Sequence, residues 1–340
     1  MRLPHLILAV ALLLAGSFVF SGCENDAKDP AIPPSTAPAT PPMPKEDQVS
    51  VPRFDMDSAY AFVAAQVAFG PRVMNTAAHD AAGEWMVDKL EEFGATVERQ
   101  KFTATAYDGT PLKSMNIIGR YNPEMEDRIL LAAHWDTRHV ADSPLETDPA
   151  AVINGADDGA SGVGVLLEIA RQLGQSAPHI GVDIVLFDAE DYGDSSGKIR
   201  DSYALGSQYY SNNLKGIRPR YGVLLDMVGA RDAEFAIEQF SQRFAPQVVR
   251  KVWKLAADMG YVRFFPQRAG SPITDDHYYV NTIAKIPMID IINHEQNNQT
   301  PFVKHWHTGN DNMDKIDKRT LRAVGQVLTA LVYREGNRTI

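Results

Sequence analysis

The sequence predicts an α/β fold, a single domain in which helices flank both faces of a mixed, mostly parallel central sheet. From about residue 51, apolar stretches of strand length alternate with stretches of helical spacing, and short turns join them. Residues 182–187 are apolar except for Asp183 and do not alternate, which is typical of a strand that helices cover on both faces. The chain shows no internal repeat, and no low-complexity segment interrupts residues 51–340, so one domain over 51–340 is favoured.

Residues 1–22 have the pattern of a secretory leader. Arg2 precedes an apolar run that is short for a transmembrane helix, and Ser21 and Gly22 are small residues typical of a cleavage site. Cys23 follows at once, so the stretch resembles a bacterial lipoprotein signal, in which this cysteine is lipidated and begins the mature chain. An ordinary secretory signal is the alternative. We expect an exported lipoprotein, anchored to a membrane and facing the periplasm or the cell surface.

Residues 23–50 are predicted to link this lipidated cysteine to the domain. The segment is rich in Pro, Ala, Ser and Thr and contains little that a core could bury. Such a composition stays extended and solvated, so we expect a flexible spacer.

Twelve helices and strands are expected in the domain, in alternation. Helices are predicted where apolar residues recur every three or four positions, at 57–69, 76–93, 160–173, 202–213, 242–259 and 317–334. Strands are predicted at 96–105, 114–121, 128–133, 182–188, 221–226 and 286–292.

The charge and the cysteine content exclude several classes of protein and site. The chain has 43 acidic and 33 basic residues and a formal charge of −10, whereas a nucleic-acid binder would show a basic face. Cys23 is its one cysteine, which excludes a disulfide framework and a thiolate metal cage. Any metal ion in the domain must therefore be held by histidines and carboxylates.

Polar residues gather where the predicted strands end. Ligands collect at the carboxyl ends of strands in open α/β sheets. Adjacent carboxylates at such a place are costly unless a positive charge lies between them. We therefore expect one metal site fed from several strand ends, with His134, Asp136, Asp188, Glu190, Asp191 and Asp226 around it.

Two further stretches supply ligands of the same kind. Asp158 lies between Gly155 and Gly159 just before a predicted helix, although an acidic residue at a helix start is equally explained as a cap. His307 follows Trp306 near the C-terminus, where a single histidine would be weak support for a metal site. One histidine, two carboxylates and a neighbouring glutamate together match a tetrahedral zinc site with one open position.

Six motifs carry a resemblance to a known family. They are HWDTR (134–138), GADDGASGVGVLLEIAR (155–171), FDAEDYG (187–193), LLDMVGA (224–230), DDHYYV (275–280) and WHT (306–308). They resemble the zinc aminopeptidases of the M28 type, and more closely their glutaminyl cyclase branch, the glutaminyl-peptide cyclotransferases. The motifs stand in the family order across 51–340. The resemblance therefore implies that 51–340 is a zinc-dependent catalytic domain.

The resemblance implies a role for each matching residue. It places one zinc ion per chain on Asp158, Asp191 and His307, and proton transfer on Glu190. It makes Asp226 and Asp275 the hydrogen-bonded acids of the pocket, with Trp306 and Asp290 as substrate-binding residues. Asp191 replaces a glutamate of the animal cyclases and Asp290 replaces a histidine, and the cysteine pair of the animal enzymes is absent.

Two functions remain open from these residues. In the first, the α-amine of an N-terminal glutamine in a peptide or protein attacks its own side-chain carboxamide, which gives pyroglutamate and ammonia. In the second, the protein is a di-zinc aminopeptidase, in which His134 and Asp226 bind a second zinc ion that Asp158 bridges to the first. The ligand set alone does not separate them; WHT, LLDMVGA and DDHYYV favour the cyclase. A binding module without activity is disfavoured, because Glu190 and every ligand are present.

The remaining aromatic and histidine candidates are expected to be structural. His277 is predicted to brace the DDH turn and Trp135 to pack in the core. His139, His294 and His305 have no support beyond their place near motifs. No oligomeric state is predicted.

Overall fold

The computed structural model describes residues 50–148, 150–294, 300 and 302–340. The described residues belong to one compact unit. The predicted leader, the predicted lipidation site Cys23 and all of the predicted linker except Ser50 lie outside these residues. None of the described helices is both long and apolar enough to cross a membrane.

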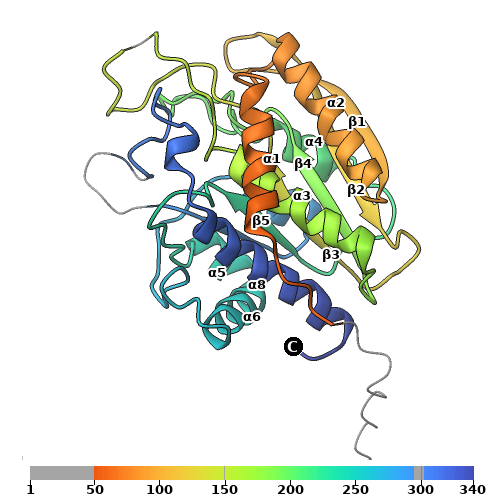
Figure 1. The fold of residues 1–340 in the computed structure, drawn as a ribbon. Helices are drawn as coiled ribbons and strands as arrows, with labels where there is room; N and C mark the ends of the chain where they lie inside the picture. The colour runs from red at the N-terminus through yellow and green to blue at the C-terminus, as the bar shows by residue number, and fades with distance from the viewer. Residues whose placement is uncertain (1–49, 149, 295–299, 301) are drawn as a thin grey trace, which may run out of the picture. The chain divides into compact units, whose positions relative to one another are not determined.

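Six strands in the described part of the chain form one sheet, whose order is β1-β2-β4-β3-β5-β6. The parallel part contains β4, β3, β5 and β6, and β1 and β2 join it antiparallel at one side (Figure 1). This arrangement confirms the predicted mixed, mostly parallel sheet. The strands are β1 (Thr96–Thr105), β2 (Pro111–Tyr121), β3 (Arg128–His134), β4 (Gly181–Phe187), β5 (Gly222–Asp226) and β6 (Met288–Ile292).

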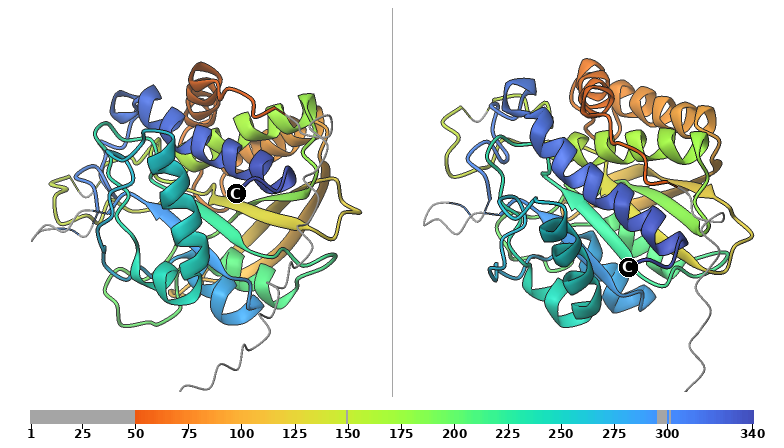
Figure 2. Two further views of the ribbon diagram at one scale, coloured as in Figure 1. Left: turned by 90° about the horizontal axis from the view of Figure 1, so that it is seen from below. Right: turned by 60° about the horizontal axis from the view of Figure 1, so that its bottom comes forward.

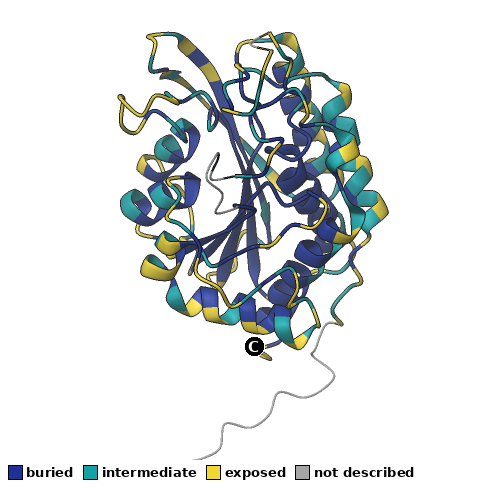
Figure 3. Cartoon of the chain, turned by 90° about the vertical axis from the view of Figure 1, so that its left-hand side faces the viewer, coloured by how far each residue is buried: buried dark blue, intermediate teal, exposed yellow. Residues whose placement is uncertain are grey.

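Helices cover both faces of this sheet, as predicted. One face carries α1 (Met56–Ala68), α2 (Ala77–Glu92), α3 (Ala160–Gln175), α6 (Pro246–Asp258) and α8 (Lys318–Gly336). The other carries α4 (Leu205–Asn212), α7 (Asp276–Tyr279) and the π-helix η2 (Val280–Ala284). Figure 2 shows the strands between these two helical layers, and Figure 3 shows that the central strands are buried.

The alternation of side chains along each strand supplies both cores. In β3, Ile129, Leu131 and Ala133 face the large cluster that includes α3 and α8, because successive side chains of a strand point to opposite faces. Leu130 and Ala132 of the same strand face the smaller cluster under α4 and η2. All seven residues of β3 are buried, and the same holds for β4. Apart from Arg128, His134 and Asp183, these strands are therefore apolar, which is why the sequence shows no regular alternation there.

The structure corrects several predicted helices. The helix predicted at 242–259 is two helices, α5 (Gln239–Phe244) and α6, which meet at Ala245. Pro246 is the first residue of α6, where its missing N–H is tolerated and its fixed backbone angle favours a helix start. The helix predicted at 202–213 begins only at Leu205, because Ala204 has a left-handed backbone conformation. The short elements α7, η2 and η3 (Met313–Lys315) were not predicted.

Candidate active site

The carboxyl ends of the parallel strands border a cavity of about 430 Å³. Side chains after β4 and at the end of β5 meet there with residues from the turn before α3, as the topology predicted. The segment just before α7 and the loop before η3 complete its walls. Its lining includes Asp158, Glu190, Asp191, Asp226, Asp275, Trp306 and His307. The sequence had singled out all seven.

Asp158, Asp191 and His307 form the first group that could hold a metal ion. One ligand atom from each lies within 4.8 Å of the others, and all three residues are buried. His307 Nε2 is 3.1 Å from Asp191 Oδ1 and 3.9 Å from Asp158 Oδ2. Asp191 Oδ2 is buried and has no hydrogen-bond partner among the described residues. A carboxylate oxygen left in this way is costly without a cation, so this group fits a zinc ion.

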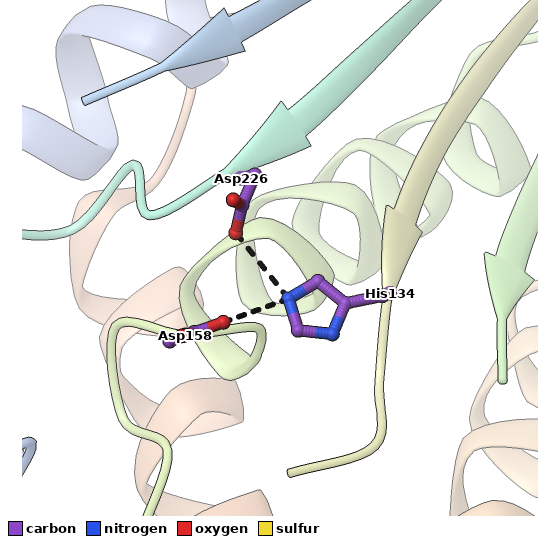
Figure 4. Close-up of side chains that lie close together, drawn as sticks. All are labelled: His134, Asp158 and Asp226. Atoms are coloured by element: carbon purple, nitrogen blue, oxygen red, sulfur yellow. Dashed lines mark hydrogen bonds and ion pairs between the residues drawn. The ribbon is translucent and has the colours of Figure 1, made fainter. Parts of the chain in front are cut away.

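His134, Asp158 and Asp226 form a second group, which shares Asp158 with the first. His134 Nε2 lies 3.0 Å from Asp158 Oδ1 and 3.3 Å from Asp226 Oδ1 (Figure 4). Burial raises the pKa of Asp226 to about 8; the hydrogen bond to His134 opposes this shift and the charge of Asp158 adds to it. The structure therefore also assembles the residues that the aminopeptidase alternative assigned to a second metal ion.

Glu190 lies beside these groups without belonging to either of them. Its backbone N–H donates to Asp136 Oδ1, and the N–H of Asp191 donates to Asp136 Oδ2, both at 3.0 Å. Asp136 thereby fixes the turn that carries a candidate ligand and the candidate acid–base residue. Burial raises the pKa of Glu190 well above its usual range, and nearby carboxylates add to this shift. The side chain of Glu190 is partly exposed at the cavity.

Asp275 begins an acidic cluster at one side of the cavity. Its side chain caps α7 by accepting the N–H of Asp276, and it lies near His277 and Asp290. Asp290 was expected to bind substrate, but it is fully buried on β6 and does not line the cavity. The structure therefore places Asp275, and not Asp290, at the cavity. Burial and the charge of Asp275 raise the pKa of Asp290 well above its usual range.

Trp306 forms an apolar wall opposite the carboxylates. Its ring stacks on the His307 ring with centroids 3.8 Å apart and lies 4.9 Å from the Phe302 ring. Ile273 and Ile292 belong to the same small apolar cluster. The cavity therefore combines acidic groups with a surface that suits an aliphatic side chain.

The residues expected to be structural have internal partners. Trp135 is fully buried and stacks on His79 with ring centroids 4.2 Å apart. His277 Nε2 lies 3.0 Å from Glu238 Oε2, and both side chains are inaccessible to solvent. His305 Nε2 lies 2.8 Å from Asp157 Oδ2, which ties the loop of His307 to the turn of Asp158.

Sequence reasoning missed several residues around the site. Asp311 accepts the backbone N–H groups of Asp157 and Asp158, at 2.8 and 3.1 Å. Asp142 contacts His307, and Arg138 contacts Asp142. Arg138 stands inside the HWDTR motif, and Asp311 stands in the acidic stretch after WHT, so both had a signal in the sequence. Asp142 and Glu238 had no such signal in the sequence.

Comparison with known proteins places these features in a family. Residues 116–332 match peptidase family M28. The structure of a Bacteroides thetaiotaomicron glutaminyl cyclase is similar, with a TM-score of 0.80 and 49% identity over 84% of this chain and 99% of that chain. A Zn-dependent exopeptidase from Parabacteroides distasonis is similar, with a TM-score of 0.81 and 50% identity over the same shares. The glutaminyl-peptide cyclotransferase of Drosophila melanogaster is 26% identical over 277 residues, which are 74% of this chain and 73% of that protein.

Proposed function

The chain belongs to peptidase family M28, and we propose that it is a glutaminyl-peptide cyclotransferase, which converts the N-terminal glutamine of peptides or proteins to pyroglutamate and releases ammonia. Glutaminyl cyclases of three bacteria, between 46% and 49% identical to this chain, support the proposal. The observation that carries it is the cavity, in which Glu190 stands beside a metal-binding group and faces further acids and the Trp306 wall.

We infer that Asp158, Asp191 and His307 hold one zinc ion per chain. Three protein ligands leave a fourth position open for substrate. The unpartnered Oδ2 of Asp191 and the clustering of the three ligand atoms support this assignment. A zinc ion held by these residues would polarise the side-chain carbonyl of the substrate glutamine.

Glu190 is the proton carrier of the proposed reaction. The α-amine attacks the carbonyl carbon of the side-chain carboxamide (Cδ), a new C–N bond closes the ring, and the bond from this carbon to the carboxamide nitrogen breaks. Glu190 accepts the proton that the amine loses and returns it to the departing nitrogen, which leaves as ammonia. No water is consumed. Glu190 suits this role because it lines the cavity and belongs to neither metal-binding group.

The other lining residues hold the substrate in the reacting geometry. Trp306 offers an apolar face to the methylene groups of the glutamine side chain. Asp226 and Asp275 offer carboxyl oxygens to its amine and carboxamide nitrogens. Such positioning lowers the activation barrier of an intramolecular reaction.

The aminopeptidase remains the second candidate, because His134, Asp158 and Asp226 also form a group that could hold a metal ion. The two functions use Asp226 differently: the cyclase needs it for substrate, and the aminopeptidase needs it on a second zinc ion.

One experiment separates these functions. The purified protein is offered a glutaminyl peptide and a leucyl amide side by side, and ammonia, free leucine and zinc per chain are measured. The cyclase predicts ammonia with one zinc ion per chain and little or no leucine. Leucine release with two zinc ions per chain, and no ammonia from the glutaminyl peptide, would establish the aminopeptidase instead.

We also propose a lipid anchor on Cys23, which would hold the exported enzyme at a membrane surface. A Cys23→Ala variant is expected to leave the membrane fraction. Recovery of the unaltered protein in the soluble exported fraction would argue for an ordinary secretory signal.

A further inference from the structure

The candidate ligand His307 is held from behind by a carboxylate. Its Nδ1 lies 2.8 Å from Asp142 Oδ1, whereas its Nε2 faces Asp191 and Asp158. A histidine whose Nδ1–H is donated to a carboxylate keeps the lone pair of Nε2 free for a metal ion. Asp142 therefore selects the tautomer of His307 that the metal site requires.

Asp142 is in turn held by Arg138, which is almost completely buried. Arg138 Nε and Nη2 donate to the two carboxylate oxygens of Asp142, at 3.2 and 2.5 Å. This paired geometry fixes the plane of the carboxylate and keeps it charged. The ring of Tyr203 lies 5.4 Å from the guanidinium carbon and further restricts the arginine side chain.

Arg138 also forms hydrogen bonds to the loop that carries Asp191, the other candidate ligand. Its Nη1 donates to the backbone carbonyls of Asp191 and Gly193, at 2.9 and 3.0 Å. One guanidinium therefore joins the turn after β4 to Asp142, and through Asp142 to His307. The backbone N–H of Ser143 donates to the carbonyl of His307 at 3.3 Å. This is a second hydrogen bond between the segment of Asp142 and the segment of His307.

We propose that Arg138 and Asp142 are positioning residues that set His307 and Asp191 in their metal-binding arrangement, so that the zinc affinity of the protein depends on them. The proposal rests on the zinc ligands assigned in the proposed function. Neither residue lines the cavity, so neither contacts substrate. Their loss is expected to weaken zinc binding and, once zinc is saturating, to leave turnover much less affected.

The chain contains a matched control for Arg138. Arg128, at the start of β3, is a second buried arginine that donates to several backbone carbonyls and pairs with one aspartate, Asp183. It lies at the opposite end of the same strand from His134 and contacts neither Asp191 nor His307. Arg128→Lys therefore tests what the loss of a buried guanidinium does to the fold alone.

The test measures the zinc dissociation constant of the purified full-length protein by competition with a chelator, with the zinc ion as the only ligand. Asp142→Asn and Arg138→Lys are expected to raise this constant about 10- to 100-fold, the usual effect of losing a partner behind a metal ligand. Arg128→Lys is expected to leave it unchanged, whatever it does to the melting temperature. Asp142→Asn is nearly isosteric and partly exposed, so it tests the proposal even if Arg138→Lys does not fold.

Two outcomes separate a failure of this inference from a failure of the ligand assignment. His307→Ala must lose most of the zinc affinity; if it does not, the ligand assignment itself is wrong. If His307→Ala loses zinc but Asp142→Asn binds it as tightly as the unaltered protein, the positioning role is refuted. An equal weakening in Arg128→Lys would also refute it, because the effect would then reflect the general stability of the fold.

Discussion

The two ends of the parallel strands bury charged groups in opposite ways. At the carboxyl end, Asp191, Asp275 and Asp290 each have a buried side-chain oxygen without a hydrogen-bond partner in the described part of the chain. At the amino end, buried acids lie against Arg or Lys side chains: Asp183 Oδ1, which also lacks a hydrogen bond, is 3.3 Å from Arg128 Nε, and Glu335 pairs with Arg220 and Lys251. Unpaired buried carboxylates cost stability, so their concentration at one end marks the place where the fold serves chemistry.

Replacing Glu190 by Gln tests the functional side of this comparison and should have the largest effect. The substitution keeps the size of the side chain but removes its capacity to carry a proton, so cyclase activity should fall about 10²- to 10⁴-fold. Zinc content should stay the same. Melting temperature should stay the same or rise, because a half-buried side chain beside other carboxylates can no longer carry a negative charge. Near-normal ammonia release from a glutaminyl peptide would remove Glu190 from the mechanism.

Replacing Arg128 by Ala tests the other end. Arg128 has about 1% of its surface exposed, donates to four backbone carbonyls and pairs with Asp183. Removing one member of a buried ion pair leaves the other uncompensated, and should lower the free energy of unfolding by about 3–5 kcal/mol. Denaturant unfolding measures the loss. Activity per folded molecule should not change; a loss of zinc or of turnover in the folded fraction would contradict the proposed division between the two ends.

The strand framework was largely predictable from the sequence, because burial on two faces leaves a direct apolar signal. The strand character of β3–β6 follows from such runs, whereas β1, whose bounds were also predicted correctly, is mostly polar and buries only Gln100. The meeting of Asp158, Asp191 and Asp226 was predictable as well, since the carboxyl ends of parallel strands share one edge. Residue type and sheet topology were sufficient to predict that these three carboxylates come together.

The supports of the site were not predictable, since they depend on loop conformation. Asp142 lies in a segment without periodicity, and its contact with His307 joins residues 165 positions apart. Arg138 acts on the backbone carbonyls of Asp191 and Gly193, which carry no residue-specific signal. Asp290 is buried on β6 and does not line the cavity, a placement that the resemblance did not indicate.

Replacing Glu335 by Gln should have an intermediate effect that depends on pH. Glu335 accepts hydrogen bonds from Arg220, Tyr221 and Lys251, and these outweigh burial and lower its pKa. A depressed pKa means that the carboxylate contributes stability above its unfolded pKa, and that this contribution is lost as pH falls through the folded pKa. Glu335→Gln should therefore cost about 1–3 kcal/mol at pH 7 and progressively less in acid. A cost that does not change with pH would show that packing, and not charge, holds this corner together.

Replacing Asp290 by Asn should have the smallest effect, and one of opposite sign. Asp290 is buried beside Asp275 and His277, and His277 is bound on its other side by Glu238. Burial and the charge of Asp275 raise the pKa of Asp290, so folding favours its protonated form. The stability linked to this proton is fully present below the unfolded pKa and is lost as pH rises towards the folded pKa.

Asparagine imitates the protonated acid at every pH and can donate to the free oxygen of Asp275. Asp290→Asn should therefore match the unaltered protein near pH 4 and exceed its stability at pH 8 by about 1 kcal/mol, the low end of what neutralising a buried charged group gives. Melting temperatures across this range, measured with and without zinc, provide the test. If the variant were less stable at pH 8, Asp290 would be an ionised and well-paired residue. The carboxyl end would then pair its charges as the amino end does.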